Sequence, residues 1–297
     1  MYKLLLFFCV LFTVSISYSQ VDDDDEVIHI SPISKVEKVS QKIVKKSSNK
    51  DEKAVSIVVA YLEAITDDIS IQDINRLRAV YKTNMFADGI DVGEANNVNF
   101  SMVWSYYDPS AMLLEVLMDG ETMSSTYINK GRTSSSTQGQ NWVAGPEIFD
   151  YSSIMTESVI LDYNFITNPD AILKYNGTET IDGVNCHVVE VPNASSYKMQ
   201  VEGEMVTGKE IMVHYYRKDN GLLYQSKRLI YQNSDANSES AEATSEVVSL
   251  YTNYQLVNGL LYPHTMNYTM EVETGVISMQ SELRGLQVNP QLEEVKI

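Results

Sequence analysis

Apolar and polar residues alternate along several stretches of the chain, and this period of two constrains the fold more than any other feature. In residues 99–106 the large apolar residues Phe100, Met102, Trp104 and Tyr106 occupy alternate positions, and residues 265–272 and 277–283 repeat the pattern. Successive side chains of a β-strand point to opposite faces of its sheet, so alternation predicts strands with one buried and one solvated face. The sequence as a whole predicts about ten strands.

Residue pairs that tolerate positive φ separate these strands. They are Asp119-Gly120, Asp182-Gly183, Asn220-Gly221, Asn258-Gly259 and Thr274-Gly275. Short turns of this kind join antiparallel neighbours, whereas parallel strands need long crossovers. The polar residues 233–246 are expected to form a longer hairpin loop. The pattern therefore predicts an antiparallel sheet.

Two stretches have helical spacing instead. Apolar residues recur every three or four positions in residues 51–65, and acidic residues in the first turn suit the helix dipole. Residues 146–175 fit one or two helical turns. The fold class expected is mainly β, a strongly curved antiparallel sheet whose concave apolar face is covered by these helices.

The N-terminus has the pattern of a secretory signal. Lys3 precedes an apolar run, and the small residues Ser17 and Ser19 predict cleavage between Ser19 and Gln20. Three segments are expected: a signal peptide over residues 1–19, a charged tail or linker over residues 20–50, and one domain over residues 51–297. The mature protein is expected to be soluble and periplasmic, or otherwise exported.

Charge and cysteine content exclude several partners and cofactors. The formal net charge of −18 gives no electrostatic footprint for nucleic acid. Cys9 lies in the expected signal peptide, which leaves Cys186 without an intramolecular disulfide partner and without a cysteine-based zinc site. We expect no cofactor and no metal.

No catalytic motif is present, and we expect no enzyme. Cys186 and His187 are adjacent, but neighbours in a strand point to opposite faces and cannot act as a nucleophile and base pair. Cys186 is expected to pack in the core beside Val184 and Val188. His29, His214 and His264 are expected at the surface or in turns.

Methionine and aromatic residues are frequent on the expected apolar face. Flexible thioethers fill irregular space and adapt to varied apolar ligands. Two alternatives stay open, a ligand cavity and a fully packed core. The candidate ligand-binding residues are Phe100, Met102, Trp104, Leu114, Val116, Met266, Tyr268, Met270 and Met279.

Several phrases resemble the LolA/LolB-like lipoprotein carriers and outer-membrane lipoprotein-sorting proteins. They include "GTETIDG" (177–183), "RKDNGLLY" (217–224) and "VNGLLYP" (257–263), within a resemblance that extends over residues 52–294. It implies an unclosed β-barrel that encloses a cavity for the acyl chains of a lipoprotein or lipid, with outer-membrane lipoprotein sorting as its setting. The family commonly has a basic residue before the proline of the "DPSAMLLEV" region, where this chain has Asp108.

A second function is compatible with the same fold. An exported interaction or scaffold module would have a fully packed core. It would act on an outer-membrane or exported protein partner through its acidic surface or its N-terminal tail.

Overall fold

The structure of the protein is a computed structural model that describes residues 49–66, 73–88, 97–108, 111–129, 132–138, 140–149, 165–201, 204–232, 243, 245–272, 275–293 and 295. The expected signal peptide and residues 20–48 of the expected tail lie outside these residues. Helix α2 (Glu52–Ile65) is followed by thirteen strands. Their bounds are β1 (Leu77–Asp88), β2 (Asn97–Asp108), β3 (Ala111–Met118), β4 (Glu121–Asn129), β5 (Arg132–Thr137), β6 (Val143–Phe149), β7 (Lys174–Ile181), β8 (Val184–Val201), β9 (Glu204–Arg217), β10 (Leu223–Gln232), β11 (Ser245–Val257), β12 (Leu260–Val272) and β13 (Gly275–Val288).

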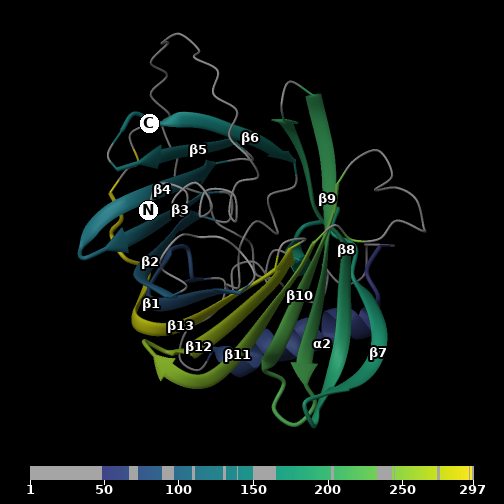
Figure 1. Ribbon diagram of the computed structural model, residues 1–297. Coiled ribbons are helices and arrows are strands. Elements are labelled where there is room, and N and C mark those ends of the chain that lie inside the picture. Colours follow the sequence, from purple (N-terminus) through teal and green to yellow (C-terminus); the bar gives the residue numbers. More distant parts are fainter. Residues whose placement is uncertain are drawn as a thin grey trace.

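The thirteen strands form one antiparallel sheet in the order β6-β5-β4-β3-β2-β1-β13-β12-β11-β10-β9-β8-β7 (Figure 1). Neighbours are consecutive in sequence except for the central pair, β1 and β13, and an additional pairing of β6 with β8. At one end the sheet bends round so that residues 147–149 of β6 pair with residues 196–198 of β8, whereas β7 pairs with the other half of β8. The expected unclosed antiparallel sheet is confirmed, with thirteen strands where about ten were expected.

Tight turns have the backbone conformation that their sequences predict. Asp119 and Gly120 have φ of 52° and 84°, and Asp182-Gly183 and Asn258-Gly259 are close to these values. Two consecutive positive φ angles match the right-handed twist of a hairpin. These turns join β3 to β4, β7 to β8 and β11 to β12, so local chemistry sets the register of three hairpins.

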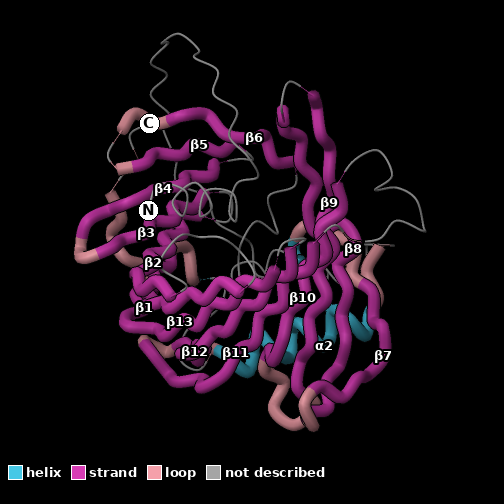
Figure 2. The backbone as a smooth tube through the Cα atoms, viewed as in Figure 1, coloured by secondary structure: helices cyan, strands magenta, loops and turns pink. Residues whose placement is uncertain are grey.

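Helix α2 lies against the concave side of the sheet, where it contacts β7 and β12 (Figures 1 and 2). The Asp51 carboxylate caps it by accepting hydrogen bonds from the backbone N–H groups of Lys53, at 2.7 Å, and Ala54, at 3.3 Å. Backbone bridges from Lys50 to Leu173 and from Thr66 to Leu260 hold its two ends. The helix buries one face in the main core, through Ala54, Val55, Ile57, Val58, Tyr61, Leu62 and Ile65.

The expected helical segment over residues 146–175 was wrong at its start and at its end. Residues 146–149 belong to strand β6 and residues 174–175 to β7, while residues 150–164 lie outside the described part. Residues 165–167 do form a helical turn. Lys50 Nζ donates to the carbonyl oxygens of Ile166, at 2.9 Å, and Asn168, at 2.6 Å, which holds this turn beside the start of α2.

Across the described residues, helices are too short or too polar to span a membrane.

Candidate functional site

The strand register brings the candidate ligand-binding residues of β2 and β3 to the concave face. Met102 lies opposite Tyr81 of β1 and Val116 of β3, and Trp104 lies opposite Ala79 and Leu114. Residues that pair across neighbouring strands point to the same side of a sheet, so these side chains of β1, β2 and β3 share one face. Alternation predicted the apolar face of each strand separately. The strand pairing shows that these apolar faces lie on the same side of the sheet.

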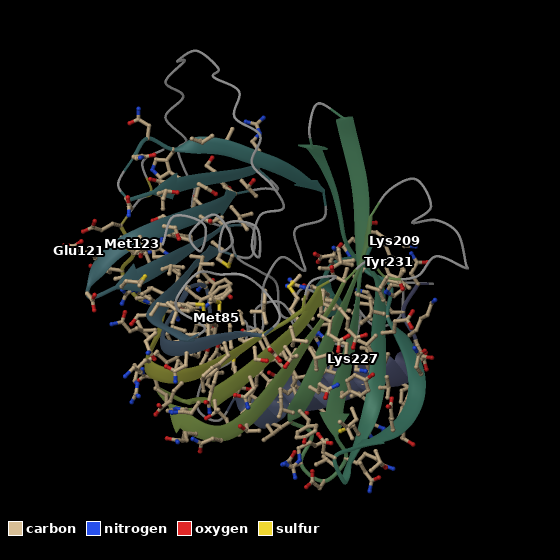
Figure 3. The ribbon with its side chains drawn as sticks, viewed as in Figure 1. Met85, Glu121, Met123, Lys209, Lys227 and Tyr231 are labelled. Atoms are coloured by element: carbon tan, nitrogen blue, oxygen red, sulfur yellow. The ribbon has the colours of Figure 1, made fainter. Side chains whose placement is uncertain are left out.

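The remaining candidates reach the same face from the C-terminal strands. Met279 of β13 lies opposite Met85 of β1 on one side and Tyr268 of β12 on the other (Met85 is labelled in Figure 3). Met266 lies opposite Ser281 in the next row. The central pair β1–β13 therefore joins the apolar surface of β2 and β3 to that of β12.

Burial divides the nine candidates into two groups. Seven are at most 8% exposed and belong to one apolar cluster with α2. These are Phe100, Met102, Trp104, Leu114, Val116, Met266 and Met279. Tyr268 is half-buried against that cluster, and Met270 is half-buried beyond it. The accessible members of the candidate set are thus both on β12, Tyr268 and Met270.

The concave face has more tyrosines than the candidate set, which includes only Tyr268. Tyr81 of β1 is buried near Tyr262, Tyr268 and Tyr106. Burial raises the pKa of Tyr81 well above its ordinary value, and the neighbouring phenols raise it further. The alternation of Leu77, Ala79 and Tyr81 in β1 was a signal that could have placed Tyr81 on the face.

A row of polar side chains crosses the concave face from β11 to β9. Ser249 lies opposite Ser226, and Ser226 lies opposite His214. The Ser226 hydroxyl is 3.0 Å from the hydroxyl of Tyr251, and His214 Nδ1 is 3.0 Å from that of Tyr216. Hydrogen bonding removes much of the cost of burying such groups.

The expectation that His214 lies at the surface was wrong. His214 is 3% exposed, and its ring is 5.7 Å from that of Phe165 in the helical turn of residues 165–167. Strand β9 is apolar on both faces, with Ile211 and Val213 on the convex side and Met212 on the concave side. Alternation therefore separated the two sets correctly but could not say which set faces the core.

Cys186 and His187 lie on opposite faces, as the strand geometry predicted. Cys186 is fully buried on the convex side in a small cluster with Val188 and Tyr215. Burial raises the pKa of its thiol, which keeps it in the poorly nucleophilic neutral form. His187 Nδ1 is 3.3 Å from the hydroxyl of Tyr175 on the concave side. The two side chains cannot act together.

Metal-binding geometry is lacking in the part of the chain that the structure describes, where no three His, Cys, Asp or Glu side chains converge.

The geometry defines an unclosed antiparallel half-barrel with a helix across its concave apolar face, and comparison with solved structures gives this fold a name. A LolA superfamily protein from Nitrosomonas europaea is similar with a TM-score of 0.50 at 11% identity, over 80% of this chain and 94% of that one. A putative outer membrane lipoprotein-sorting protein domain from Vibrio parahaemolyticus gives 0.47 at 12% identity, over 82% and 95%. The chain has a LolA-like fold, which confirms the resemblance in fold.

No family model and no curated protein sequence matches the chain.

Proposed function

We propose that the protein is a non-catalytic, exported binding protein for an apolar ligand, and that its cargo is the acyl chain of a lipoprotein or lipid. The observation that carries this proposal is the single concave face to which β1, β2, β3, β12 and β13 all contribute methionine and aromatic side chains. The LolA-like fold and the signal-like N-terminus support a setting in outer-membrane lipoprotein sorting.

The physical basis is transfer of hydrocarbon out of water. Each CH₂ group removed from water contributes about 0.8 kcal/mol, so a long acyl chain needs no catalytic or charged group to bind. Methionine side chains can rearrange around chains of different shape. Met85, Met102, Met266 and Met279 lie on this face together with the half-buried Met270.

The burial of the same side chains favours the alternative function. Seven candidates are at most 8% exposed, as they would be in an interaction module with a fully packed core. In that case the acidic surface or the N-terminal tail would contact a protein partner. Ligand binding separates the two functions directly.

A matched pair of variants on β12 provides the test. Met270 is half-buried on the concave face, and its neighbour Thr269 is exposed on the convex face. Binding of a neutral fluorescent probe, the methyl ester of 11-(dansylamino)undecanoic acid, is measured for Met270→Asp and Thr269→Asp. A new carboxylate on the concave face should weaken binding at least tenfold because it must be desolvated, whereas the convex one should not.

Saturable binding by the wild type and by Thr269→Asp, with loss in Met270→Asp, would support the proposal. Absence of saturable binding by the wild-type protein would refute it and favour the interaction module.

A further inference from the structure

A positively charged side chain, Arg228, lies on the concave face of β10. The residues before it fix its direction. Lys227 lies over the ring of Tyr215 on the convex side, with Nζ 6.0 Å from the ring centroid (Lys227 is labelled in Figure 3). Ser226 is hydrogen-bonded to Tyr251 on the concave side. Because side chains alternate along a strand, Arg228 points to the same side as Ser226.

The strand register places a row of apolar side chains beside Arg228. Arg228 lies opposite Val247 of β11, Val247 opposite Met270, Met270 opposite Ile277, and Ile277 opposite Ala87 of β1. From Val247 to Ala87 the apolar row crosses three strand-to-strand steps of about 4.8 Å, or about 14 Å, and the step from Arg228 to Val247 brings the total to about 19 Å. That length suits a long hydrocarbon chain.

Accessibility falls from one end of this row to the other. Val247 and Met270, next to Arg228, are half-buried, as Arg228 itself is. Ile277 and Ala87 at the far end are 1% and 8% exposed. A ligand with one charged end and one apolar end would match this gradient, with its charged end beside Arg228.

The guanidinium of Arg228 is available for such a contact. Among the residues that the structure describes, none forms an ion pair or a hydrogen bond with this guanidinium. Met212 and Val247 flank it on the neighbouring strands. Glu210 shares the concave face but lies opposite Ile230, diagonally from Arg228. Hydrogen bonds between a guanidinium and a carboxylate or phosphate are strong and can be bidentate.

We propose that Arg228 recognises the headgroup of an anionic amphiphile, whose single long chain lies along the row from Val247 to Ala87. The headgroup chemistry is a carboxylate or a phosphate. This inference rests on the proposed function, because it assigns the ligand class and the orientation of the ligand within the same apolar face.

The test compares two variants that each remove one positive charge from β10. Arg228→Gln acts on the concave face, and Lys227→Gln acts on the convex face. Binding of 11-(dansylamino)undecanoic acid and of its neutral methyl ester is measured by fluorescence titration, and thermal unfolding confirms that the variants fold. Wild type should bind the acid more tightly than the ester, and Arg228→Gln should weaken acid binding about tenfold without changing ester binding.

The outcomes separate this inference from the proposed function. Equal binding of acid and ester by the wild type, or equal loss in both variants, would overturn the role of Arg228 and leave the proposed function standing. Failure of both probes to bind would refute both proposals. Competition by dodecanoate, dodecyl phosphate and dodecanol identifies the headgroup, and competition by dodecanol equal to that of both anions would also overturn the inference.

Discussion

The hydroxyls of Thr83 and Ser281 are predicted to be energetically coupled across the centre of the sheet. They lie opposite each other on β1 and β13, with 2.9 Å between Oγ1 and Oγ, and neither side chain is exposed to solvent. Replacing one partner leaves the other hydroxyl buried without this bond, which costs about 1–3 kcal/mol, whereas replacing both leaves no unpaired hydroxyl. The double variant should therefore be more stable than the sum of the single changes implies.

The assay is a double-mutant cycle with Thr83→Val and Ser281→Ala, measured by urea unfolding. We expect each single variant to lower the free energy of unfolding by about 1–3 kcal/mol, with a coupling energy of at least about 1 kcal/mol. Ser278→Ala is the control, because Ser278 lies on the other face of β13, and it should change stability by less than about 0.5 kcal/mol. Additive single effects would refute the central pairing of β1 with β13.

Three further predictions concern the helix cap, the buried cysteine and pH. Asp51→Ala should lower the free energy of unfolding by about 1 kcal/mol in urea titrations because α2 loses its cap. Cys186 should react with a thiol reagent far more slowly in the native than in the unfolded protein, and Cys186→Ala should leave probe binding unchanged because Cys186 lies on the convex side. Burial raises the pKa of Tyr107 and of Tyr215 to about 12, from 10.0. The stability that these neutral phenols contribute is complete below pH 10 and is lost as pH rises towards 12, which unfolding free energies across that range would show.

The sequence predicts only part of the sheet's arrangement. The alternation in residues 99–106 and 265–272 identified a common apolar face because the period of two is a local property of each strand. Hairpins such as the one at Asp182-Gly183 were equally local, since two adjacent residues determine the turn. The pairing of β1 with β13, nearly two hundred residues apart, has no local signal, and the central position of Met85 and Thr83 could not be predicted.

The errors have a similar origin. His214 was assigned to the solvent because Ile211, Val213 and Tyr215 already form an apolar set, but β9 also has Met212 and Tyr216 on its other side. A strand that is apolar on both faces gives no local indication of which face is concave. Arg228 was missed because its apolar neighbours Val247 and Met212 belong to other strands, so the sequence of β10 does not indicate them.

The central claim, that the concave apolar face holds an acyl chain, is tested most directly by native mass spectrometry of residues 20–297, purified without added lipid. We expect a bound species whose mass matches an acyl-containing molecule in the wild type and in Thr269→Asp, and its absence from Met270→Asp. A wild-type protein that carries no lipid and shows no saturable binding of the dansyl methyl ester would contradict it.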